Sequence, residues 1–197
     1  MTEGQRISGS AGQWVGGSVS QRVGGSAGRS IGRSAGRLAA ILLPLCLAAP
    51  LPILHAQGGL PIGTLVSPVV VPDLDDQPFD FATVLGRKPV VVQFWATWCS
   101  ICEALMPTMR AAKAQYGDRV EFIGVNVTVN QTPARVRRYL EEHSPPFRNL
   151  YDKRGLAVRA FEAPATGFIT IVGADGKVAY TGSGERQDIV AALGRIV

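Results

Sequence analysis

The sequence predicts an α/β domain in which a mixed β-sheet lies between layers of helices. Apolar runs typical of buried strands alternate with segments whose apolar residues recur every three or four positions, as on one face of a helix. Near the C-terminus, two apolar runs flank Gly173–Lys177, whose Asp-Gly dipeptide signals a hairpin. The alternating part requires parallel strands joined by right-handed crossovers, and the hairpin adds antiparallel strands.

The expected elements follow one another from about residue 69 to the C-terminus. Pro107 lies inside one expected helix and should kink it, whereas Thr132 and Pro133 fit the N-cap and first position of another. We expect an edge strand at 69–71, a short strand or helical turn at 79–85, and further strands at 90–95, 120–127, 147–151, 168–172 and 178–181. We expect helices at 99–116, 133–143, 156–161 and 186–196.

A Cys-x-x-Cys pair, Cys99 and Cys102, lies where the apolar strand at 90–95 gives way to a helix. A thiol at a helix N-terminus meets unpaired N–H groups and the positive end of the helix dipole, which favour the thiolate. Such thiols can have a pKa several units below the free value of about 8.5. The pair could exchange disulfides, bind metal or staple the fold.

Spacing and composition weigh against two of these roles. A disulfide across a two-residue loop constrains little chain and so stabilises the fold little. A closed zinc site usually needs four ligands, and no other Cys or His cluster accompanies Cys99 and Cys102. We therefore expect no metal and no other cofactor.

Residues 1–56 form an expected leader ahead of a globular domain at 57–197. Residues 1–37 are rich in Gly, Ser and Arg, and an uncharged apolar stretch follows at 38–54, interrupted by three prolines. Together with the small residue Ala56, this pattern predicts a secretory signal peptide. A retained membrane anchor through residues 38–54 is the alternative. Either reading places the domain in the periplasm or cell envelope.

The basic character of the chain belongs mostly to this leader. The whole sequence carries 20 Lys and Arg against 15 Asp and Glu, a net charge of +5. Five of the arginines and one glutamate lie before residue 57, so the domain itself has 15 basic and 14 acidic residues and a net charge of +1. The charge therefore gives no reason to expect nucleic-acid binding.

The motifs together resemble the thioredoxin superfamily, and more closely its TlpA/ResA-like extracytoplasmic branch. The resemblance covers about residues 65–197. It rests on the string Trp-Ala-Thr-Trp-Cys-Ser-Ile-Cys at 95–102, on Pro107, and on Ala163-Pro164 ahead of the strand–Asp-Gly-Lys–strand hairpin. The segment between 127 and 156 is similar to the insertion typical of that branch.

The resemblance implies a thioredoxin-like three-layer fold and assigns roles to individual residues. Cys99 would be the exposed nucleophile and Cys102 the buried resolving thiol. Trp98 would offer an apolar contact to the partner. Pro164 would be cis and packed against the dithiol, and the backbone before it, at Ala163, would pair with an extended substrate chain.

Among the departures from the family pattern, two concern proton handling. Gln93 stands where cytoplasmic thioredoxins carry a buried acid that helps move the proton of the second thiol. Leu105 stands where the TlpA/ResA branch often has a glutamate. Glu103 lies nearby but faces another side of the helix, so the proton acceptor for Cys102 is unassigned.

The resemblance implies an extracytoplasmic thiol–disulfide oxidoreductase that works in the reducing direction, in cytochrome c maturation or in general thiol homeostasis. Its partners would be protein disulfides or dithiols and a membrane electron donor or acceptor protein. One alternative is a redox-inactive or copper-handling binding module, although three Met residues supply no soft-ligand cluster. A peroxidase-type redoxin is disfavoured because Ala96, three residues before Cys99, replaces the usual Thr or Ser.

Overall fold

The structure of the protein, a computed structural model, describes residues 58–197. The predicted signal peptide or anchor and its cleavage point lie outside these residues. In the described part, no helix has the length and apolar character needed to cross a bilayer. Its elements are β1 (Val70–Pro72), β2 (Pro78–Asp80), the 3-10 turn η1 (Phe81–Thr83), β3 (Val90–Trp95), α1 (Ser100–Ala104), α2 (Met106–Tyr116), β4 (Glu121–Asn126), α3 (Pro133–His143), β5 (Arg148–Tyr151), α4 (Leu156–Ala160), β6 (Phe168–Val172), β7 (Val178–Gly182) and α5 (Ile189–Gly194).

A five-stranded sheet with the strand order β5-β4-β3-β6-β7 forms the centre of the domain. β3 pairs in parallel with β4, and β4 in parallel with β5, whereas β6 and β7 add antiparallel pairs. The mixed sheet expected from the sequence is therefore confirmed. β3 occupies the middle position, and all six of its residues are buried.

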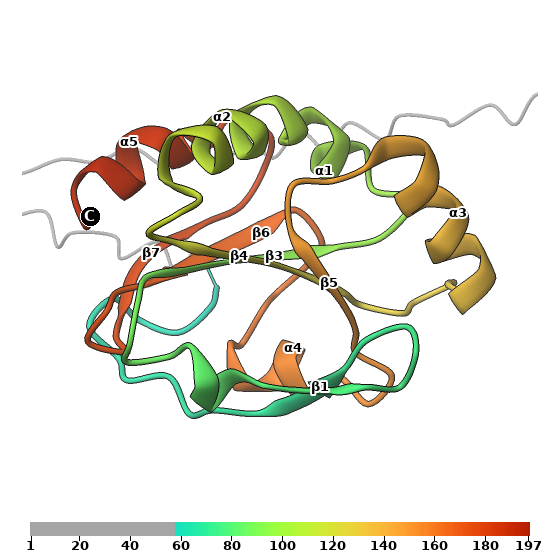
Figure 1. The fold of residues 1–197 in the computed structure, drawn as a ribbon, viewed down its shortest axis with the longest axis horizontal. Coiled ribbons are helices and arrows are strands. Elements are labelled where there is room, and N and C mark those ends of the chain that lie inside the picture. Colours follow the sequence, from blue (N-terminus) through green and yellow to red (C-terminus); the bar gives the residue numbers. More distant parts are fainter. Residues whose placement is uncertain (1–57) are drawn as a thin grey trace, which may run out of the picture. The chain divides into compact units, whose positions relative to one another are not determined.

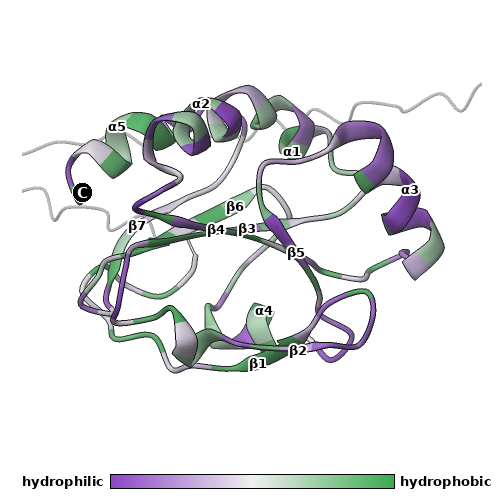
Figure 2. Ribbon diagram, viewed as in Figure 1, coloured by the Kyte–Doolittle hydropathy of each residue, from purple (hydrophilic) through white to green (hydrophobic). Residues whose placement is uncertain are grey.

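Helices and a hairpin cover the two faces of this sheet. α1, α2, α3 and α5 lie over one face, and α4 with the β1–β2 hairpin lies under the other (Figure 1). An apolar core lies on each face of the sheet, and successive side chains of β3 point to opposite faces. Val91 and Trp95 pack under the helices, whereas Val92 and Phe94 pack toward α4. Figure 2 shows the hydrophobic strands between helices whose outer faces are more hydrophilic, most clearly at α3.

The predicted helix at 99–116 is interrupted where its proline lies. α1 ends at Ala104 and α2 begins at Met106, with Pro107 in the first turn of α2. Proline has no N–H to donate to the preceding turn and crowds the carbonyl of residue i−4, so the ladder breaks here as expected.

The start of α3 also agrees with the sequence. The Thr132 side chain accepts a hydrogen bond from the Arg135 N–H at 3.2 Å, and Pro133 opens the helix.

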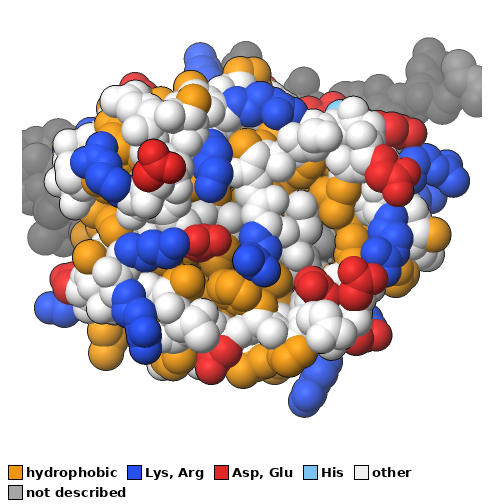
Figure 3. Space-filling model, in the orientation of Figure 1, with side chains coloured by type: hydrophobic (Ala, Val, Ile, Leu, Met, Phe, Trp, Pro, Cys, Tyr) orange, Lys and Arg blue, Asp and Glu red, His pale blue; other side chains and the backbone are white. Residues whose placement is uncertain are grey.

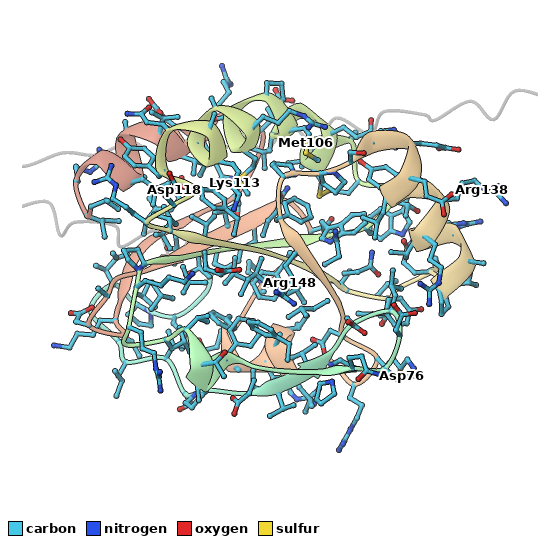
Figure 4. The ribbon with its side chains drawn as sticks, in the orientation of Figure 1. Asp76, Met106, Lys113, Asp118, Arg138 and Arg148 are labelled. Atoms are coloured by element: carbon cyan, nitrogen blue, oxygen red, sulfur yellow. A yellow bond between two sulfur atoms is a disulfide. The ribbon has the colours of Figure 1, made fainter. Side chains whose placement is uncertain are left out.

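The expected edge strand at 69–71 does not join the main sheet. It pairs with β2 in a separate two-stranded sheet, closed by a turn in which Asp73 Oδ1 accepts the N–H groups of Asp75 and Gln77. Arg148 of β5 holds this hairpin beside the sheet, with its guanidinium carbon 5.4 Å from the centre of the Phe79 ring (Figure 4). The hydrogen bonds of Asp73 therefore stabilise the turn of this hairpin.

Ion pairs contribute little to this architecture. Among the described residues there are three: Lys88–Glu121, Arg137–Asp75 and Lys153–Asp76, all with partly exposed side chains. Exposed pairs are typically worth less than about 1 kcal/mol. Basic and acidic side chains are interspersed on the face drawn in Figure 3. Burial of the two apolar cores, rather than charge pairing, therefore holds the layers together.

Candidate functional site

Cys99 and Cys102 form a disulfide at the carboxyl end of the central strand, with Cα atoms 5.2 Å apart. A turn follows β3, in which the Cys99 N–H donates to the Ala96 carbonyl at 3.1 Å. Cys99 is then the N-cap of α1, and its Sγ accepts the Cys102 N–H at 3.1 Å. The sulfur thus occupies the position where a capping side chain satisfies a free helix N–H group.

Both cysteines are nearly buried in this oxidised form. Cys99 is 3% exposed and Cys102 is 1% exposed, so the expectation of an exposed Cys99 is wrong for the disulfide state. The exposed groups are its neighbours: Trp98 is 51% exposed and Ile101 is 37% exposed. A partner therefore meets an apolar rim before it reaches sulfur.

The loop at 127–132, which joins β4 to α3, holds the turn before Cys99 in place. The Trp98 indole N–H donates to the Val129 carbonyl at 2.9 Å, and the Thr97 N–H donates to Gln131 Oε1 at 3.1 Å. The Tyr151 hydroxyl in turn contacts the Gln131 carbonyl at 3.4 Å. No sequence pattern signalled Gln131, because its contacts with Thr97 and Tyr151 join segments 20 or more residues apart in the chain.

A groove of about 460 Å³ opens beside Trp98. Three residues singled out from the sequence, Trp98, Ala163 and Pro164, line it together. The remaining walls come from the β4–α3 loop, from α4 and from the segment before β6: Val127, Val129, Gly155, Val158, Arg159, Ala165 and Thr166.

Pro164 does not have the expected geometry. No peptide bond in residues 58–197 is cis, so the prediction of a cis Pro164 is wrong. The residue against the Cys-Ser-Ile-Cys segment is Gly167, where an added Cβ would lie 2.5 Å from the Ile101 Cγ2 atom. The Gly167 N–H donates to the Phe94 carbonyl at 2.8 Å, a bond that proline could not make. Pro164 lies three residues earlier and borders the groove.

Gln187 fixes the Gly167 position from the other side. Its buried amide donates to the Gly167 carbonyl at 2.9 Å and to the Gly184 carbonyl at 2.7 Å. Both backbone groups of Gly167 are therefore occupied, whereas the N–H and C=O of Thr166 have no hydrogen-bond partner among residues 58–197. Thr166 keeps a free backbone edge on the border of the groove.

Gln93 is buried beneath the dithiol helices without any hydrogen bond. It is 0% exposed, and neither its Oε1 nor its Nε2 has a partner within the described chain. Its side chain shares a face with Val91 and Trp95, which belong to the same core as Cys102. Leu105, which stands where the TlpA/ResA-like branch often has a glutamate, is an apolar member of the same core and supplies no carboxylate.

Glu103 is directed elsewhere. It is exposed, and its carboxylate acts on Tyr139 of α3, whose pKa is raised above 10 mainly by burial and further by this negative charge. The residues described by the structure contain no group of three His, Cys, Asp or Glu side chains placed to hold a metal.

Known proteins are similar to this chain in sequence. The family described as Redoxin matches residues 61–194. A thioredoxin of Mycolicibacterium smegmatis is 34% identical over 104 residues, which cover 53% of this chain and 82% of that protein. The thiol-disulfide oxidoreductase ResA of Bacillus cereus is 28% identical over 126 residues, 64% of this chain and 71% of ResA. The thioredoxin-like protein YneN of Bacillus subtilis is 34% identical over 70 residues, 35% of this chain and only 41% of YneN.

Solved structures show the same fold. A thioredoxin-family thiol:disulfide interchange protein from Chlorobium tepidum superimposes with a TM-score of 0.58 at 23% identity, covering 70% of this chain and 98% of that one. A secreted Mycobacterium tuberculosis disulfide oxidoreductase, described as homologous to E. coli DsbE, gives a TM-score of 0.56 at 23% identity over 64% of this chain and 95% of the other. The thioredoxin-like fold expected from the sequence is confirmed.

Replacing Gln93 by methionine, a side chain of similar shape, should raise stability. The substitution removes two buried polar atoms that lack partners, so we expect the free energy of unfolding of the oxidised protein to rise by about 1–2 kcal/mol in urea denaturation. The exposed Gln115→Met is the control and should change it by less than about 0.5 kcal/mol. A loss of stability in Gln93→Met would mean that the amide is hydrogen-bonded in solution.

Gly167→Ala should destabilise the oxidised protein by about 1–3 kcal/mol, because the new Cβ meets Ile101 and Gly167 has a φ of +77°. Gly63→Ala isolates the backbone contribution, since Gly63 has a φ of +85° but open space around it. Combining Gly167→Ala with Ile101→Ala should recover part of the loss, as a double-mutant cycle measures. Strict additivity of the two changes would show that Ile101 does not pack on Gly167.

Proposed function

The chain belongs to the redoxin family, within the thioredoxin superfamily, and we propose that it is a thiol–disulfide oxidoreductase that exchanges disulfides with client proteins. One observation carries the proposal: the Cys99–Cys102 disulfide lies at the N-terminus of α1, with Cys99 Sγ accepting a helix N–H group. In the reduced protein the same N–H group would stabilise a Cys99 thiolate.

The reaction we propose has two exchange steps. The Cys99 thiolate attacks one sulfur of a client disulfide, which forms a mixed disulfide and releases the other client sulfur as a thiolate. Cys102 then loses its proton and attacks Cys99 Sγ, which releases the second client sulfur and forms the Cys99–Cys102 disulfide. The client gains two electrons, and the protein must be re-reduced by a separate dithiol donor.

The groove beside Trp98 is the proposed contact surface for clients. Ala163 and Pro164 supply apolar wall, as Trp98 does. The backbone role expected at Ala163 is better placed at Thr166, because the Ala163 N–H already donates to the Val158 carbonyl at 2.9 Å. An extended client chain could add to the free backbone edge of Thr166 as a short strand.

We propose the reducing direction and a site of action in the periplasm or cell envelope. The support is the resemblance to the TlpA/ResA-like extracytoplasmic branch, together with the 28% identity to the thiol-disulfide oxidoreductase ResA. A leader at 1–56, a membrane electron donor or acceptor protein, and a role in cytochrome c maturation or general thiol homeostasis belong to the same proposal. The leader is inferred from the composition and the apolar stretch of residues 1–56, whereas the electron-transfer partner and the cellular role are inferred from the family resemblance.

Substitution of the cysteines tests the mechanism. Cys99→Ser should abolish dithiothreitol-driven reduction of insulin disulfides, because it removes the attacking sulfur. Cys102→Ser should keep the attack but lose the resolving step, so it should accumulate mixed disulfides with clients, visible as adducts that reductant dissolves. Retained turnover in Cys99→Ser would refute the assignment of the nucleophile.

Trp98 offers a matched pair of substitutions. Trp98→Phe keeps an apolar ring but loses the hydrogen bond to the Val129 carbonyl, whereas Trp98→Ala removes the ring. We expect KM for insulin to rise about fivefold to tenfold in Trp98→Ala and less in Trp98→Phe, since a buried aromatic contact contributes about 1 kcal/mol or more. The rate with a small disulfide should stay within about twofold in both. Equal losses with insulin and the small disulfide would mean that Trp98 supports the turn rather than the client.

A further inference from the structure

One charged side chain lines the otherwise apolar groove beside the dithiol. Of the described residues that form its walls, Arg159 alone carries a charge. It lies in the last turn of α4 and shares the groove with Trp98, the residue that directly precedes Cys99. A client held in a mixed disulfide with Cys99 would therefore pass over a groove with apolar walls and one positive charge.

The Arg159 side chain is held in place by the backbone that precedes α4. Its Nη2 donates to the Arg154 carbonyl at 2.8 Å. Gly155 makes room for this contact, because a Cβ there would lie 3.0 Å from Arg159 Nη1. The guanidinium is thus positioned at the groove while its residue remains exposed.

Within residues 58–197, no carboxylate pairs with Arg159. The acid that lies before α4, Asp152, is buried and accepts the N–H groups of Leu156 at 2.7 Å and Val158 at 3.1 Å. Asp76 is likewise occupied by Lys153. The remaining guanidinium N–H groups of Arg159 have no partner in this part of the chain.

We propose that Arg159 makes this groove selective for client segments that combine an apolar residue with Asp or Glu near the reacting cysteine. This inference rests on the proposed oxidoreductase function and adds the class of client. The apolar walls would take the apolar side chain, Thr166 would align the client backbone, and the planar guanidinium matches the two oxygens of a carboxylate. Arg159 is then a specificity-determining residue, and the cysteines perform the chemistry.

Chromogenic peptides test the proposal directly. Each short peptide carries one apolar residue and one cysteine, joined through a disulfide to thionitrobenzoate, and Glu, Gln or Lys is placed in turn at each neighbouring position. Attack of reduced Cys99 joins it to the peptide sulfur and releases coloured thionitrobenzoate, after which Cys102 frees the peptide thiol. The reduced full chain should react with the best Glu peptide about fivefold faster than with its Lys counterpart, the size expected of an exposed ion pair.

Arg159→Glu should reverse this order, so that the Lys peptide reacts faster, and added salt should shrink the difference in both proteins. Arg138→Glu makes the same change of charge on the outer side of α3, where Figure 4 shows Arg138 pointing away from the molecule, and should keep the preference for Glu. Equal rates for Glu, Gln and Lys peptides, or the same order in Arg159→Glu, would overturn the selectivity alone. Absence of thionitrobenzoate release from every peptide would overturn the oxidoreductase function as well.

Discussion

The burial of β3 on both faces is the constraint on which the rest of the structure depends. Its six residues divide between two cores, one under α1, α2, α3 and α5 and the other facing α4 and the β1–β2 hairpin. Neighbouring strands on both sides fix its register. A strand held so completely has a rigid carboxyl end, and the turn that leaves it places Cys99 at the start of α1 within reach of Cys102. The position of the sulfurs is therefore a consequence of sheet packing.

Near the disulfide the structure contains buried polar groups without hydrogen-bond partners and a residue with a positive φ, features that ordinarily destabilise a fold. Gln93 buries an amide with no partner in the core that contains Cys102, and Trp95 buries its indole N–H in the same way. Gly167 has a positive φ, and because it lacks a Cβ, Ile101 occupies the space where a side chain would lie. Exceptions to local consistency of this kind tend to cluster at functional sites. Here they lie directly beneath and beside the disulfide.

Much of the fold and the centre of the site could be predicted from the sequence, because their signals are local. The apolar run of β3, the Cys-x-x-Cys pair after it, the Thr132 cap and the Gly173–Lys177 hairpin each depend on neighbours in the chain. Gly167 and Gln131 were missed because their roles come from contacts across the fold, with Ile101 and with Thr97. The expected cis Pro164 packed against the dithiol was wrong for the same reason: the position that meets Ile101 is Gly167, and only the folded structure shows this. The near burial of Cys99 likewise follows from packing around the whole turn.

We expect Cys99 and Cys102 to form a reversible redox couple rather than a structural disulfide. Equilibration of the full chain in dithiol buffers of graded potential, with free thiols then counted by alkylation and mass spectrometry, tests it most directly. We expect one two-electron transition, in which both thiols are lost together, at a potential above about −300 mV. A disulfide that stays intact in buffers poised below about −300 mV, the range of structural disulfides, would contradict it.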